Sequence, residues 1–170
     1  MTLLRRRIVL AMAALPLAAC GPAPLQGFAD FAAARKAIES LATGWRSTGA
    51  FNLVQMLNHA AQSVEFSLRG FPELKSAVFR LTVGSAAFAV FDARGSMSHS
   101  LNEPIPGSPA LAAGDALDGA IARALKALQD FEAHTGPLAP HFAYGALDKA
   151  QYTRAHLMHM ANHWTDVVRA

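Results

Sequence analysis

The apolar residues of this chain recur at helical spacing, and this pattern constrains the fold more than any other feature. Over residues 115–134 a buried stripe is predicted, formed by Leu117, Ile121, Leu125, Leu128 and Phe131. No segment alternates with period two over a useful length. The sequence therefore predicts an all-α domain, an up-and-down bundle of four or five helices.

Four further helices are expected over residues 28–43, 52–70, 73–91 and 148–168. Asn52 and Asp148 are typical N-caps for the second and the last of these helices, and Gly70 ends the second. Gly84 weakens the third helix. Residues 92–109 are rich in proline and glycine, which predicts one long loop of a kind that is usually functional or mobile.

The first nineteen residues predict a signal peptide. Three arginines, Arg5 to Arg7, precede a short apolar segment that Pro16 interrupts, so the segment is too short to span a bilayer. Of the chain's 15 basic residues these three belong to the signal, which leaves twelve basic and 12 acidic residues in the rest. The folded part therefore has no electrostatic case for binding nucleic acid.

The sequence Leu17-Ala18-Ala19-Cys20 resembles a bacterial lipobox, in which the signal is cut before a cysteine that carries a diacylglycerol. This predicts a signal peptide over 1–19, an anchor and tether over 20–27, and a folded domain over 28–170. The protein is then exported and held by lipid on the periplasmic side of the cell envelope. The arginines also resemble a twin-arginine signal, so both export routes stay open.

Three histidines of the last predicted helix share one face. His156, His159 and His163 are three and four residues apart and fall within roughly a 60° arc. Tyr152 and Asp166 are expected to point in nearly the same direction. Two histidines at i and i+4 can bind one metal ion from a single helix.

The second predicted helix offers a further ligand. His59 shares a polar strip with Gln55, Gln62 and Ser63, flanked by apolar residues. If this helix faces the last one, His59 completes a three-histidine set with open metal positions, which is typical of a reactive site. His99 and His134 are interpreted as exposed or capping residues. His141 remains a candidate site residue because it lies just before the last predicted helix.

The segments Leu57-Asn58-His59-Ala60-Ala61-Gln62-Ser63, His141-Phe142-Ala143-Tyr144-Gly145 and His159-x-x-x-His163 resemble the DUF1569 family, which belongs with the DinB-like metalloenzymes. The resemblance covers about residues 31–164. It implies a DinB-like four-helix bundle with His59, His159 and His163 as metal ligands. Phe142 and Asn162 depart from the family pattern, and His156 is extra to the ligand set, either supporting the ligands or replacing one.

The resemblance implies a metal-dependent transferase acting by thiol S-transfer, or a hydrolase, with Zn²⁺, Ni²⁺ or Fe²⁺ as the ion. Its substrate is a small molecule, and a thiol or an anion is favoured because three neutral imidazoles leave the ion's charge uncompensated. The residues expected to contact substrate or ligands are Gln55, Gln62, His141, Tyr152 and His156. Such bundles are often homodimers. The alternative is a non-catalytic, lipid-anchored binding or structural protein, in which the imidazoles pair with groups such as Asp166.

Overall fold

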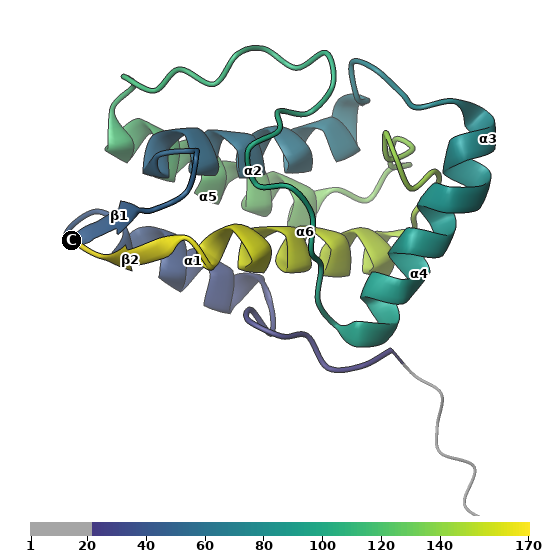
Figure 1. Ribbon diagram of the computed structural model, residues 1–170, viewed down its shortest axis with the longest axis horizontal. Helices are drawn as coiled ribbons and strands as arrows, with labels where there is room; N and C mark the ends of the chain where they lie inside the picture. The colour runs from purple at the N-terminus through teal and green to yellow at the C-terminus, as the bar shows by residue number, and fades with distance from the viewer. Residues whose placement is uncertain (1–21) are drawn as a thin grey trace, which may run out of the picture.

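A computed structural model describes residues 22–170 of the chain (Figure 1). These residues fold mainly as α-helices, which confirms the all-α class. The expected signal peptide and Cys20 lie outside the described residues. Between residues 22 and 170 no helix combines the length and the apolar character needed to cross a membrane.

Capping side chains set where two of the long helices begin. The helix α2 (Leu53–Arg69) follows Asn52, whose side chain accepts from the Gln55 N–H while the Gln55 side chain accepts from the Asn52 N–H. The helix α6 (Lys149–Trp164) begins with the same motif at Asp148. Both predicted starts are confirmed.

Two other helices are shorter than expected. The helix α1 (Phe31–Ser40) begins after the cap Asp30, three residues later than the predicted start at residue 28. The helix α5 (Leu117–Ala133) begins two residues after the predicted start at residue 115. The periodicity of apolar residues does not show where a helix ends, because the apolar stripe continues past the last helical residue.

The third predicted helix is a rod made of three segments. These are α3 (Ala77–Phe79), the π-helical η1 (Arg80–Gly84) and α4 (Ser85–Arg94). The rod begins at residue 77 rather than 73 because the Ser76 side chain caps it. Within η1 the Ser85 N–H donates to the carbonyl of Arg80, five residues back.

The prediction that the last helix reaches about residue 168 was wrong. The helix α6 ends at Trp164, and β2 (Val167–Arg169) then pairs antiparallel with β1 (Trp45–Ser47). The Thr48 N–H extends this pairing by donating to the Asp166 carbonyl at 2.8 Å. Three-residue strands are too short to show period-two alternation, so they could not be predicted from the pattern of residues.

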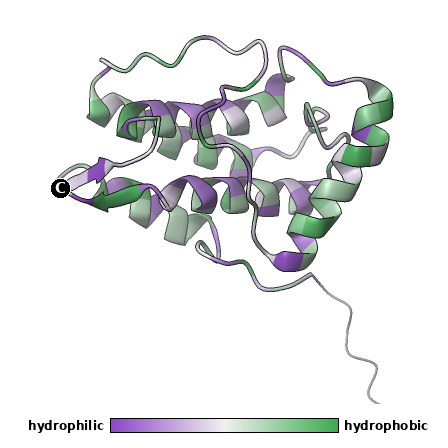
Figure 2. Cartoon of the chain, in the orientation of Figure 1, coloured by the Kyte–Doolittle hydropathy of each residue, from purple (hydrophilic) through white to green (hydrophobic). Residues whose placement is uncertain are grey.

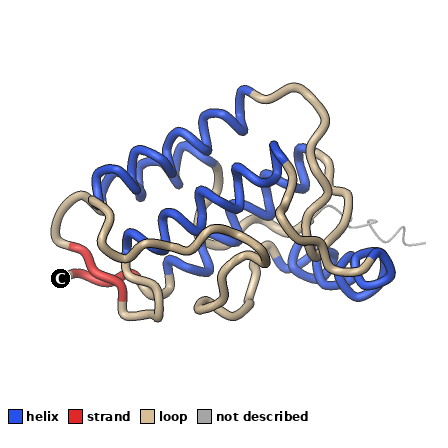
Figure 3. The backbone as a smooth tube through the Cα atoms, turned by 90° about the horizontal axis from the view of Figure 1, so that it is seen from above, coloured by secondary structure: helices blue, strands red, loops and turns tan. Residues whose placement is uncertain are grey.

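The long helices enclose one core. Figure 1 shows α2 beside α5 and α6 beside α1, and Figure 3 shows the helices from above. The packing of α2 on α5 is the most extensive contact between helices. α6 contacts both α2 and α1, and α4 packs against α6. The most deeply buried apolar and aromatic side chains are Ile38, Leu41, Leu57, Val64, Leu128, Phe131, Tyr152, Leu157 and Met158.

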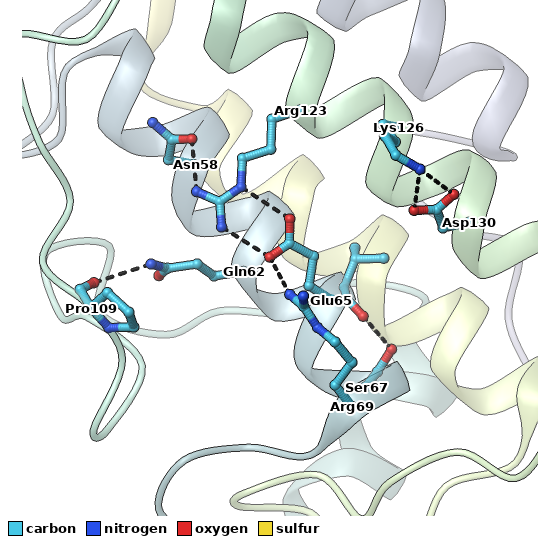
Figure 4. A network of polar contacts seen from close by, with 10 residues as sticks. Asn58, Gln62, Glu65, Ser67, Arg69, Pro109, Arg123, Lys126 and Asp130 are labelled. Carbon is cyan, nitrogen blue, oxygen red and sulfur yellow. Dashed lines mark hydrogen bonds and ion pairs between the residues drawn. The ribbon is translucent and has the colours of Figure 1, made fainter.

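A polar network fixes the register of α5 on α2 (Figure 4). The Arg123 guanidinium donates to both carboxylate oxygens of Glu65, at 3.0 and 2.9 Å, and to the Asn58 side-chain oxygen at 3.1 Å. Burial alone would raise the pKa of Glu65, but hydrogen bonds and charges from Arg123 and Arg69 lower it. This carboxylate is therefore ionised and holds the two helices together.

Part of the expected tether is bonded to the domain. The Gln26 N–H donates to the Gly95 carbonyl at 2.8 Å, and Arg154 donates to the Ala23 carbonyl at 2.9 Å. The described chain therefore begins beside the end of α4, rather than becoming attached only at Phe28.

The rod faces solvent along most of its length. Val78 and Leu81 are 74% and 75% exposed, and Figure 2 shows hydrophobic residues along the outside of α3 and α4. Only Gly84 and Phe88 of the rod are buried. The rod is therefore attached to the rest of the domain at few points.

Gly84 is one of those points, and it yields a test. A Cβ atom at this position would lie 1.8 Å from the Ala143 carbonyl oxygen. We expect Gly84→Ala to lower the free energy of unfolding by about 2 kcal/mol, although alanine is the better helix former, because the two backbones must separate. Urea unfolding followed by circular dichroism measures the change.

Gly119 provides the matched control. It also lies in a helix, but a Cβ there would meet nothing within 4 Å. Gly119→Ala should be neutral or stabilise by up to about 1 kcal/mol. Equal stabilities for the two variants would contradict the close approach at Gly84.

Candidate metal centre

Three buried imidazoles converge at the interface of α2 and α6. The Nε2 atom of His159 lies 3.1 Å from Nε2 of His59 and 3.1 Å from Nε2 of His163, and one ligand atom from each ring lies within 4.8 Å of the others. Ligands about 2.1 Å from a tetrahedral ion are roughly 3.4 Å apart. These residues, the three-histidine cluster, therefore have the spacing of a metal site.

Local structure explains the convergence. His159 and His163 are one turn apart on α6, and the packing of α6 on α2 brings His59 to them from 100 residues away along the chain. The Phe51 ring covers the cluster, with its centroid 5.5 Å from that of His59 and 6.2 Å from that of His163. The cluster is thus built on two rigid helices and shielded by an aromatic ring.

Burial keeps these imidazoles neutral. It lowers the pKa of His59 to about 4, with the charge of His99 as a smaller cause, and it lowers the pKa of His163 to about 3. The pKa of His159 is likewise well below its usual range, first because of burial and then because of the neighbouring histidines. Neutral imidazoles have the lone pairs that a metal ion needs.

One ring of the cluster has an unsatisfied nitrogen atom. His59 Nδ1 is buried without a hydrogen-bond partner among the described residues, whereas metal-bound histidines usually donate this proton. Asp166, expected on the same face, lies beyond the end of α6, and in residues 22–170 no hydrogen bond joins its carboxylate to the cluster. The cluster therefore has no carboxylate partner in this part of the chain.

His99 belongs near the site, and its interpretation as an exposed or capping residue was wrong. Its ring is half-buried, with the centroid 5.0 Å from that of His159 and 5.8 Å from that of His163. Its Nδ1–H donates to the Ser100 carbonyl at 2.7 Å, so in the neutral form of the ring Nε2 carries the lone pair. A loop residue has no periodicity, so nothing in the sequence places it over a helix 60 residues away.

Gln55 and Gln62 bind the long loop. The Gln55 side chain donates to the Leu111 carbonyl at 3.2 Å, and the Gln62 side chain donates to the Pro109 carbonyl at 3.1 Å (Figure 4 shows Gln62). Asn52, the N-cap of α2, donates to the Ala113 carbonyl at 3.1 Å. These carbonyls belong to alternate residues of an extended segment. The two glutamines of the polar strip therefore donate to the loop, which continues from residue 95 to 116, longer than predicted.

Two more expected site residues are held by other contacts. The Tyr152 hydroxyl donates to the Ala139 carbonyl at 2.7 Å, and this side chain is completely buried. The Ser67 hydroxyl donates its one proton to the Val64 carbonyl, so the 3.2 Å contact between His156 Nε2 and Ser67 must have the imidazole as donor. His156 is therefore not one of the converging ligands.

A cavity of about 260 Å³ adjoins the cluster. His59 and His159 form part of its wall, together with His99, His141 and His156. The loop covers it through residues 97–106. An ion at the cluster would thus have one side next to a space that can hold a small molecule.

His156 gives the metal-free protein a defined acid sensitivity. Burial, and then the charge of Lys149, lower its pKa from 6.5 to about 3. The unfolded chain therefore binds a proton that the folded chain does not, and stability falls as the pH drops below 7. Between about pH 7 and pH 5 this residue should account for a loss of about 2 kcal/mol.

Chelator-treated His156→Gln protein should therefore lose about 2 kcal/mol less than wild type over this range, as measured by urea unfolding at each pH. Any constant effect of the substitution cancels in the comparison. His134→Gln, at the end of α5, controls for the loss of a histidine as such. An unchanged pH dependence in His156→Gln would show that the folded protein protonates this ring readily.

Comparison with known proteins gives a family but no function. The model of the family described as "Protein of unknown function (DUF1569)" matches residues 25–170. No curated protein and no solved structure matches the chain. The family match spans nearly all of the described residues, including the cluster, the cavity and the loop. The chain belongs to the DUF1569 family.

Proposed function

We propose that His59, His159 and His163 hold one divalent ion, and that the protein is a metal-dependent enzyme acting on a small molecule in the adjoining cavity. The convergence of three neutral Nε2 atoms within 4.8 Å carries this proposal. Imidazole ligands suit zinc, nickel and iron. Three protein ligands leave a coordination position open, as catalytic sites require.

The proposal includes a DinB-like architecture. In this arrangement α1, α2, α5 and α6 form an up-and-down four-helix bundle, and the rod of α3, η1 and α4 lies outside it. Contacts of α2 with α5 and α6, and of α1 with the same two helices, support this assignment. The ligands then come from facing helices of one bundle, which hold them more rigidly than loops would.

The reaction proposed is thiol S-transfer or hydrolysis. When bound, the ion acts as a Lewis acid and lowers the pKa of a water or thiol ligand. The protein contributes three ligands without charge, so the site favours an anionic or thiolate group. The loop contributes residues 97–106 to the wall of the cavity, and the neutral form of His99 has an Nε2 lone pair that can accept a hydrogen bond beside the cluster.

Metal content tests this proposal directly. Protein purified without a histidine tag should contain about one equivalent of one metal by inductively coupled plasma mass spectrometry. His59→Ala and His163→Ala should both lose it, because two remaining imidazoles bind too weakly. His134→Ala should keep it.

A folded wild-type protein that stays empty after reconstitution with Zn²⁺, Ni²⁺ and Fe²⁺ would contradict the enzyme proposal. It would leave the lipid-anchored binding or structural protein. If the metal is present, assays of thiol transfer and of hydrolysis should show activity that the two ligand variants lack.

We also propose export to the cell envelope, with a lipid on Cys20 anchoring the domain on the periplasmic side. The described chain begins at Pro22, two residues after this cysteine, and its first residues are bonded to the end of α4. A short tether of this kind would keep the domain close to the membrane surface. One acyl group alone binds reversibly, whereas the several chains of a bacterial lipoprotein anchor stably.

Lipid labelling tests the anchor. In a bacterial host given radiolabelled palmitate, the wild-type protein should carry label and remain in the membrane fraction. Cys20→Ser should carry no label, because no other cysteine exists in the chain. Label on the variant, or unlabelled wild-type protein in the soluble fraction, would contradict the proposal.

A further inference from the structure

The cavity beside the three-histidine cluster has the size and lining of a small-molecule site. Its volume is about 260 Å³, whereas a cavity of about 150 Å³ is enough for benzene. Ile105, Phe142 and Ala155 contribute apolar surface to its wall. A ligand of this site therefore has an apolar body somewhat larger than a benzene ring.

His141 gives this wall a hydrogen-bond donor. Its Nδ1 accepts from the backbone N–H groups of Ala143 and Tyr144, both at 3.2 Å, so the proton of the neutral ring must be on Nε2. His141 is 8% exposed, and no described residue accepts from its Nε2. Nε2 is not one of the fully buried unpaired atoms, so this N–H is accessible and can donate to a ligand in the cavity that His141 lines.

The ring is held in place. It stacks on Tyr144, with centroids 4.2 Å apart and planes 5° from parallel, and it meets the edge of Phe71 at 5.0 Å. Burial lowers the pKa of His141 to about 3, with the charges of His156 and His99 as smaller causes. At neutral pH the wall thus presents a fixed N–H without a positive charge.

The charges around the cavity do not favour an ionic ligand. Lys75 and Glu103 both line it, and their charges oppose each other. With His141 neutral, the lining has no lysine or arginine besides Lys75. An acceptor oxygen without charge is therefore the better match for His141.

We propose that the cavity binds a small neutral molecule with an apolar body and a carbonyl oxygen, and that His141 Nε2–H donates to this oxygen. As a statement about the substrate of the metal centre, the inference rests on the proposed function, with the anionic or thiolate group at the ion and the neutral carbonyl compound in the cavity. The binding itself needs no ion. It can therefore succeed or fail separately from the metal measurement.

Acetophenone and α-methylstyrene are suitable probes, because they have nearly the same shape and only the first has a carbonyl. Their dissociation constants are measured by calorimetry with metal-free protein. His141→Phe should weaken acetophenone binding about tenfold and change α-methylstyrene binding little, since only the first probe loses a hydrogen bond. Ala155→Leu, which fills the cavity, should weaken both probes.

A second measurement needs no variant. In nitrogen-15 spectra of wild-type imidazoles, acetophenone should shift the His141 Nε2–H resonance more than α-methylstyrene does. Benzoate, which is charged, tests whether the cavity prefers a neutral ligand. It should bind metal-free protein more weakly than acetophenone. The proposal is overturned if acetophenone does not bind in the millimolar range, if His141 responds equally to both probes, or if benzoate binds more tightly.

The same protein preparation distinguishes the two proposals. Carbonyl binding without any metal uptake would contradict the metal centre and leave the cavity assignment intact. Metal uptake without carbonyl binding would contradict the cavity assignment and leave the metal centre intact.

Discussion

The contact between His59 on α2 and His159 on α6 is the constraint around which the rest of the domain is arranged. It takes neutral imidazoles out of water, and within residues 22–170 no carboxylate approaches them in compensation. Three Nε2 atoms then face one another, although a hydrogen bond between two of them uses only one proton. The helix packing that enforces this, with Arg123 tying α5 to α2, holds an arrangement that a shared cation would stabilise.

The parts of this structure that depend on local chemistry could be predicted from the sequence. Caps at Asn52 and Asp148 predicted where α2 and α6 begin, and i, i+4 spacing placed His159 and His163 on one face. That His59 would join them came from the family resemblance and from its place in a polar strip. The β1–β2 pairing and the position of His99 depend on contacts between distant segments, which leave no periodic signal.

The long loop is more ordered than its proline and glycine content suggests. Side-chain amides of Asn52, Gln55 and Gln62 bind alternate carbonyls of its second half, while its first half brings His99 and Ile105 over the cavity. One helix therefore supplies a histidine of the cluster from one position and supports the loop over the cavity from others. This explains why α2 has a polar strip that neither the core nor the solvent requires.

The position of α6 in the chain determines when the cluster can form. His159 and His163 lie in the last twelve residues, and β2, which pairs with β1, follows them directly. While the C-terminus is still being synthesised, α2 can pack on α5, but His59 has no partner histidines. An ion held by the three histidines would therefore be acquired only after α6 has been synthesised and has packed on α2. If the protein is exported as proposed, a chain exported unfolded would take this ion from the periplasm, whereas one exported folded would carry an ion chosen in the cytoplasm.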